Sequence, residues 1–196
     1  MKKLVLLAVL ALALPITAFA DAGVDYTNSA GTLAGSNSGL TLSGSVLINA
    51  AGVTGSNLGS VSFATGALSS GSLQAGGTFA AGGWFTITGN GSGGVPTGTL
   101  FTGTFTGPVT WTLVTLANGT HNYTLTGALS GTTNTGFSTV GVTVQLTINT
   151  GKGYFNGSTS ISSGDTNIVV PEPGSLTLLG TGLVGIAGTI RRKLKA

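Results

Sequence analysis

The sequence contains no cysteine, one histidine and only four acidic residues among its 196 positions. Without cysteine the chain can form neither disulfide bonds nor thiolate metal sites, and it has no cysteine nucleophile. Charge is also missing from the centre of the chain, because no Asp, Glu, Lys or Arg occurs between Tyr26 and Gly151. Binding to nucleic acid requires cations that neutralise phosphates, so this composition excludes a nucleic acid as partner.

The basic residues nevertheless outnumber the acidic ones and give a formal net charge of +3. Most of them stand at the two ends of the chain. Lys2 and Lys3 precede an apolar run, and a second basic group follows an apolar segment near the C-terminus. Basic residues in these positions are typical of export and topology signals rather than of a partner-binding surface.

Residues 1–20 have the pattern of a secretory signal peptide. The basic start is followed by the apolar run Leu4–Leu14 and by small residues at Ala18 and Ala20. This order, with an apolar run of about 7–15 residues, is typical of signal peptides. The run is also shorter than the about 20 residues of a membrane-spanning helix. We predict cleavage by signal peptidase after Ala20, with Ala18 and Ala20 forming the recognition site.

Residues 169–196 carry a second export pattern. An uncharged segment rich in Leu and Gly covers residues 175–190, which as a helix would extend about 24 Å against a hydrocarbon core of about 30 Å. Basic residues that follow an apolar span stay on the cytoplasmic side. We therefore predict a transmembrane helix over 175–190 and a basic tail over 191–196. The predicted stop-transfer residues are Arg191, Arg192, Lys193 and Lys195.

A short proline-containing motif precedes this segment. It consists of Val170, Pro171, Glu172, Pro173 and Gly174. Together with the apolar segment, the basic tail and the signal peptide, the motif resembles the PEP-CTERM sorting signal of exported proteins of Gram-negative bacteria. The resemblance implies processing by an exosortase-type membrane transpeptidase and a place at the cell surface or in a biofilm and exopolysaccharide matrix. It implies no activity, because some ice-binding proteins carry the same tail.

Residues 21–168 are expected to form one β-domain rich in Gly, Thr and Ser. Apolar and hydroxyl residues alternate in several stretches, a pattern typical of strands with one buried face. It assigns Val46, Ile48 and Val140 to that face, and Asn118-Gly119 is expected to form a hairpin turn. We predict an all-β, jelly-roll-like antiparallel β-sandwich. A β-solenoid is the alternative, although the segments show no fixed repeat period.

Few residues of this domain are suited to catalysis or metal binding. A Ser–His–Asp arrangement would have to combine His121 with Asp165, and nothing in the sequence brings them together. His121 follows a turn, where an exposed loop histidine is expected. Asp165 lies in an oxygen-rich segment, residues 162–167, that is either a plain turn or a weak calcium site, and Asp21 and Asp25 lie near the new N-terminus. We predict no enzymatic activity, no metal site and no cofactor.

A neutral polymer is the partner that suits this composition best. Aromatic rings can stack on sugar faces while Thr, Ser and Asn bind sugar hydroxyls. The aromatic candidates are Tyr26, Trp84, Trp111, Tyr123 and Tyr154. Trp111 alternates with apolar residues and is expected in the core, whereas Trp84 is expected to be partly exposed.

Repeated Thr-x-Thr stretches, such as Thr102 to Thr106, suggest a polar sheet surface that could also order water. Threonine is equally a good residue for the solvent face of a strand. We predict an exported, non-enzymatic cell-surface or matrix protein with extracellular polysaccharide as partner. The alternative is a carbohydrate- or ice-binding module that uses a Thr and aromatic sheet face.

Overall fold

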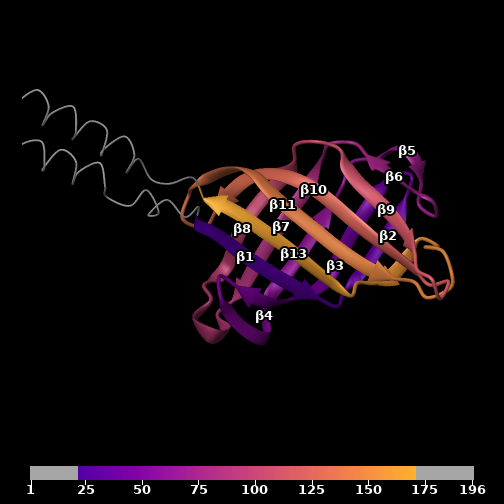
Figure 1. Ribbon diagram of the computed structural model, residues 1–196. Coiled ribbons are helices and arrows are strands. Elements are labelled where there is room, and N and C mark those ends of the chain that lie inside the picture. The colour runs from indigo at the N-terminus through magenta and orange to yellow at the C-terminus, as the bar shows by residue number, and fades with distance from the viewer. Residues whose placement is uncertain (1–21, 171–196) are drawn as a thin grey trace, which may run out of the picture. The chain divides into compact units, whose positions relative to one another are not determined.

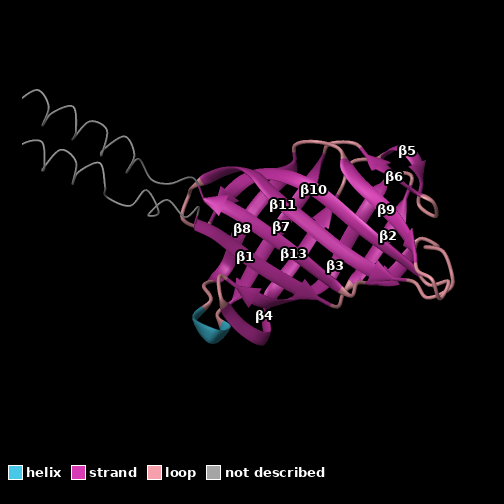
Figure 2. Ribbon diagram, in the orientation of Figure 1, coloured by secondary structure: helices cyan, strands magenta, loops and turns pink. Residues whose placement is uncertain are grey.

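The computed structural model describes residues 22–170, of which residues 23–170 form one compact unit. Within this range the chain forms thirteen β-strands and no α-helix (Figures 1 and 2). The all-β character is as predicted, because a chain rich in Thr, Ser, Val and Gly opposes helix formation. The Asn118-Gly119 turn also forms as predicted. Gly119 has φ 78° there, and its N–H donates to the carbonyl of Leu116 at 2.9 Å.

The thirteen strand segments make up eight long strands. Five of the long strands are interrupted, and the two segments of each one pair with the same neighbouring long strands. The interrupted strands are β1 (Ala22–Ser29) with β2 (Thr32–Ser36), β4 (Val53–Ala64) with β5 (Leu68–Ser72), β6 (Gly76–Phe79) with β7 (Gly82–Asn90), β8 (Thr97–Phe105) with β9 (Val109–Thr115), and β12 (Ser158–Ser160) with β13 (Ser163–Val170). The uninterrupted strands are β3 (Gly39–Ala50), β10 (His121–Thr133) and β11 (Ser138–Asn149). A single 3₁₀ turn, η2 (Ser92–Gly94), follows β7.

Each long strand pairs with the next one along the chain, so the chain runs up and down around a common interior (Figure 1). The last long strand returns to the first, because β13 neighbours β1 and β12 pairs with β2. The sheet therefore closes into an eight-stranded barrel. The predicted β-sandwich is wrong, and so is the solenoid alternative. Alternation along a strand is the same in a sandwich and in a barrel, and it is the order of strand pairing and the pairing of the first and last strands that distinguish them.

Apolar side chains fill the barrel interior. Four phenylalanines pack against one another with ring centroids 5.9–6.4 Å apart, namely Phe63, Phe85, Phe101 and Phe105. A second aromatic group lies further along the barrel, where Trp111 stacks on Tyr123 at 4.9 Å and meets Phe155 edge-on at 5.5 Å. An eight-stranded barrel has an interior of about the width that side chains can fill, and these rings occupy much of it.

A β-bulge in β3 changes which of its residues are buried. The register against β4 shifts between Leu42 and Ser45, around Gly44, which has φ 66°. One extra residue moves every following side chain to the other face. Leu47 is therefore fully buried, whereas Val46 and Ile48, predicted on the buried face, are only partly buried.

A second bulge acts in the same way in β11. Leu129 pairs with Val142 and Ser130 with Val140, so that Gly141, with φ 78°, is left out of the pairing. Val140 consequently points outward and is 74% exposed. The prediction that Val140 belongs to the buried face is wrong, because the alternation of the sequence is continuous across a bulge that the backbone inserts.

Candidate functional site

Most of the predicted export residues lie outside the described residues. These are Ala18, Ala20, Pro171, Glu172, Pro173, Gly174, Arg191, Arg192, Lys193 and Lys195. Val170 is the exception, since it is the last residue of β13. The Pro-Glu-Pro motif thus follows a barrel strand with no residue between them. None of the helical structure within residues 22–170 is long and apolar enough to cross a membrane, and the predicted span over 175–190 lies outside that range.

Three of the aromatic candidates are buried, namely Tyr26, Trp111 and Tyr123, and the last two stabilise the barrel through hydrogen bonds. Trp111 is 1% exposed, as expected of a core residue, and its Nε1–H donates to the carbonyl of Leu73 at 2.9 Å. The hydroxyl of Tyr123 donates to the carbonyl of Gln74 at 2.7 Å and accepts from the N–H of Phe155 at 3.1 Å. Both rings therefore tie neighbouring loops to the core, and neither is free to stack on a ligand.

Trp84 and Tyr154 are the exposed aromatic candidates. Trp84 lies near the start of β7 and is 45% exposed, which confirms the prediction that it is partly exposed. Tyr154 lies in the loop between β11 and β12 and is 57% exposed. These two rings can offer a face to a ligand from solvent, and they lie on different parts of the barrel.

Hydroxyl residues of neighbouring strands lie opposite one another on the outer surface, in what we call the hydroxyl rows. Successive members of each row are direct cross-strand partners, whose Cβ atoms are about 4.5–5.5 Å apart in antiparallel sheets. The rows are Ser62–Thr86–Thr102–Thr132, Thr78–Thr110–Thr126 and Thr112–Thr124–Thr147. Trp84 precedes Thr86 by two residues and therefore lies on the same face of β7. The sequence shows the Thr-x-Thr spacing, but only the strand pairing aligns it into rows.

His121 is the first residue of β10, and it is buried rather than exposed as predicted. Only 7% of its surface is accessible, because the loop that follows β11 folds over it. Tyr154 from that loop packs on the imidazole with ring centroids 4.3 Å apart, and the N–H of His121 donates to the carbonyl of Gly151 at 2.7 Å. Within residues 22–170 the Nδ1 atom has no hydrogen-bond partner.

The structure does not assemble a triad from His121 and Asp165. The side chain of His121 belongs to the buried face of β10, whereas Asp165 is exposed on β13 between two buried residues, Gly164 and Thr166. The two side chains therefore lie on opposite sides of the barrel wall. A general base cannot act on a group that it does not reach.

Asp165 lies within strand β13 and not in the predicted loop, and it is next to Asp25 on β1. The hydroxyl of Thr27 donates to Oδ1 of Asp165 at 3.2 Å. Burial raises the pKa of Asp25 above its ordinary value, and the nearby charge of Asp165 and a hydrogen bond with it act in the same direction. Two carboxylates and a hydroxyl are fewer than the six to eight oxygens that calcium takes. Sequence reasoning missed this pair because barrel closure alone brings β13 beside β1.

We expect Asp165→Asn to reduce the pH dependence of stability that the raised pKa of Asp25 causes, because the variant removes the contribution of Asp165 and leaves that of burial. An acid whose pKa is raised in the folded state binds more protons when folded, so the free energy of unfolding falls as pH rises from the ordinary pKa through the raised one. At pH 7 the variant should be more stable by less than about 1 kcal/mol, because solvent screens exposed pairs. Denaturant unfolding between pH 3 and pH 7 measures this effect. Asp25→Asn should act in the same direction with a larger effect, because it also removes the burial of a carboxylate. Adding Asp165→Asn to it should gain nothing more, and additive gains would contradict the coupling.

Comparison with known proteins identifies the C-terminal residues only. Residues 169–193 match a family model described as the PEP-CTERM protein-sorting motif. No curated protein matches the sequence, and no solved structure matches the fold. The match covers the Pro-Glu-Pro motif and the basic residues up to Lys193, and it begins inside β13. The chain is therefore an exported protein that carries a PEP-CTERM sorting signal and is a substrate of exosortase.

Proposed function

We propose that the barrel is a non-enzymatic component of the cell surface or extracellular biofilm matrix that associates with neutral polysaccharide. The observation that carries this proposal is the set of hydroxyl rows on the outer surface, with the exposed ring of Trp84 beside the first row. Each hydroxyl both donates and accepts hydrogen bonds, as sugar hydroxyls do. An indole face supplies the apolar contact that a sugar ring requires.

The charge distribution supports a neutral partner. Between residues 22 and 170 the ionisable acids and bases other than His and Tyr are Asp25, Lys152 and Asp165. None of them belongs to a hydroxyl row, so a neutral polymer can approach these rows without the cost of desolvating a charge. A polyanion would gain nothing there, because the rows offer no cation to pair with its charges.

The burial of His121 supports a role without catalysis. Its imidazole lies under Tyr154, on the inner side of the barrel wall, while Asp25 and Asp165, the carboxylates of residues 22–170, are on the outer surface. General acid–base chemistry needs such groups within hydrogen-bond reach of one substrate. This placement separates the titratable groups that hydrolysis of a polymer would use together.

Ice binding is the second candidate, because rows of threonine could order water. An ice plane requires a flat array of groups, however, and the strands of a closed barrel are tilted and twisted. The hydroxyl rows therefore follow a curved surface, which a flexible polysaccharide can track and a flat crystal plane cannot. We therefore favour polysaccharide as the partner. An ice-recrystallisation assay on the same protein tests the alternative.

We expect Trp84→Ala to weaken binding to the exopolysaccharide of the native host by about three- to tenfold, which corresponds to the ~0.5–1.5 kcal/mol of an aromatic contact. Affinity electrophoresis of the full-length chain through gels containing that polysaccharide measures the change. Thr102→Val, which replaces a hydroxyl in a row by a methyl group of the same shape, should weaken binding in the same direction.

Phe137→Ala is the matched control, since Phe137 is an equally exposed aromatic residue, 54% accessible, that belongs to none of the rows. It should leave binding unchanged. If Trp84→Ala binds the polysaccharide as tightly as the parent chain, the hydroxyl rows are not the binding surface. The same follows if Trp84→Ala, Thr102→Val and Phe137→Ala all lose the same affinity.

A further inference from the structure

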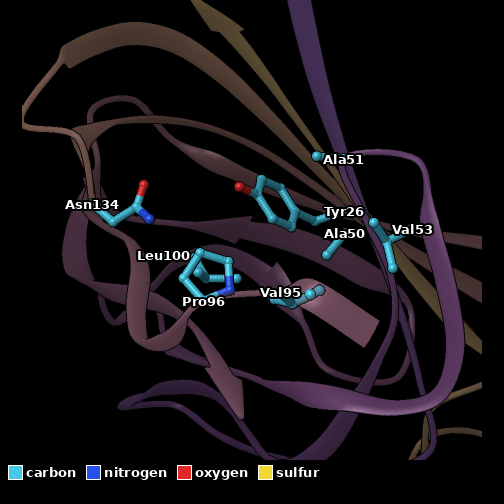
Figure 3. Close-up of a pocket in the computed structure, with 9 residues that line it drawn as sticks. Tyr26, Ala50, Ala51, Val53, Val95, Pro96, Leu100 and Asn134 are labelled. Carbon is cyan, nitrogen blue, oxygen red and sulfur yellow. The ribbon is translucent and has the colours of Figure 1, made fainter. Parts of the chain in front are cut away.

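A small pocket lies at the end of the barrel that is opposite Tyr154. Its volume is about 180 Å³, and its walls come from β1, the turn between β3 and β4, the segment around η2, and the turn between β10 and β11 (Figure 3). Most of the lining is aliphatic, and the residues that matter for its chemistry are Tyr26, Val53, Val95, Pro96, Leu100 and Asn134. The pocket is separate from the hydroxyl rows, so a ligand bound there does not depend on the proposed polysaccharide partner.

Two polar groups face one another across this aliphatic space. The hydroxyl of Tyr26 points toward the side-chain amide of Asn134, as Figure 3 shows. The backbone N–H of Asn134 donates to the carbonyl of Leu100 at 2.9 Å, which fixes the turn that carries the amide. The hydroxyl of Tyr26 is protonated at neutral pH, as tyrosine ordinarily is, and burial raises its pKa further, so it can donate. An amide both donates and accepts.

We propose that this pocket binds a small, neutral ring compound that carries one hydroxyl group, with its ring among Val53, Val95 and Leu100 and its hydroxyl between Tyr26 and Asn134. An apolar cavity of about 150 Å³ accommodates benzene, so the volume here accepts one substituted six-membered ring. The lining carries no charge, which disfavours ionic ligands. A sugar ring is unsuitable, because most of its hydroxyls would lie unpaired against aliphatic side chains.

The hairpin that carries Asn134 also exposes apolar side chains around this end of the barrel. Phe137 is 54% exposed in the turn after β10, and Val140 is 74% exposed at the start of β11. Exposed apolar residues that gather beside a pocket are typical of ligand-binding regions. The bulge at Gly141 turns Val140 outward here, although its side chain would otherwise be buried.

Binding can be tested with phenol, toluene, benzoate and methyl glucoside as probes. The full-length chain in lipid nanodiscs, with labelled Val and Leu methyl groups, is titrated with each compound by NMR, and empty nanodiscs correct for partitioning into lipid. Phenol should shift the methyl resonances of Val53, Val95 and Leu100 selectively, and benzoate and methyl glucoside should not. Phenol should bind more tightly than toluene, which lacks the hydroxyl.

Two variants remove the polar contacts without changing the shape of the barrel core. Tyr26→Phe and Asn134→Ala should each weaken phenol binding by about three- to tenfold, the worth of one neutral hydrogen bond, while toluene binding stays the same. Tyr154→Phe, at the opposite end of the barrel, is the control and should change neither. Absence of selective shifts with phenol, shifts spread over the whole barrel, or equal binding of methyl glucoside would overturn the proposal.

Discussion

Trp111→Ala is expected to lower the free energy of unfolding by about 3–5 kcal/mol, the cost of removing a large buried ring. The ring is 1% exposed, stacks on Tyr123 at 4.9 Å and meets Phe155 at 5.5 Å. The same change removes the donor to the carbonyl of Leu73 and so loosens the turn between β5 and β6. A cavity of this size at one end of a filled barrel cannot collapse without moving paired strands.

The other tryptophan is the control for this experiment. Trp84 is 45% exposed, and Trp84→Ala should cost less than about 1 kcal/mol. Denaturant unfolding of the full-length chain, followed by far-ultraviolet circular dichroism, measures both variants under the same conditions. Similar losses for the two variants would show that the barrel core is not where the structure places it. If Trp84→Ala is stable, a loss of polysaccharide binding by this variant is not caused by unfolding.

Gly83→Ala is expected to cost more than about 3 kcal/mol, in the range of the most damaging single substitutions. Gly83 has φ 75°, and a Cβ there would overlap the backbone carbonyl oxygen of Ala64 on the neighbouring strand. Neither backbone can move away freely, because Ala64 pairs with Trp84 in the same ladder. The barrel must therefore shift its register or open locally to admit one methyl group.

Gly141→Ala measures the conformational part of that cost alone, so the difference between the two variants gives the steric part. Gly141 has nearly the same backbone conformation, φ 78°, but a Cβ there would have no atom within 4 Å. Only the left-handed conformation is then penalised, by about 1–2 kcal/mol. Thermal unfolding of the two full-length variants side by side measures the difference. If both lose the same stability, close approach of β4 to Gly83 is not what requires glycine at that position.

The sequence alone determined the features that depend on neighbouring residues. The Pro-Glu-Pro motif predicts a sorting signal because its residues act in linear order, and the family match over 169–193 confirms it. The alternation around Trp111 correctly places this residue in the core, because a strand turns successive side chains to opposite faces. Trp84 was correctly placed at the surface by the same argument.

Only the tertiary structure decided the features that depend on which strands meet. Closure of β13 on β1 made the sheet a barrel and brought Asp165 beside Asp25, although they are far apart in sequence. The bulge at Gly141 exposed Val140, and the loop carrying Tyr154 buried His121. Alternation fixes a side chain relative to its own strand, but pairing, bulges and loop packing depend on the free energy of the whole sheet. That energy is set by contacts between distant residues, which no local pattern contains.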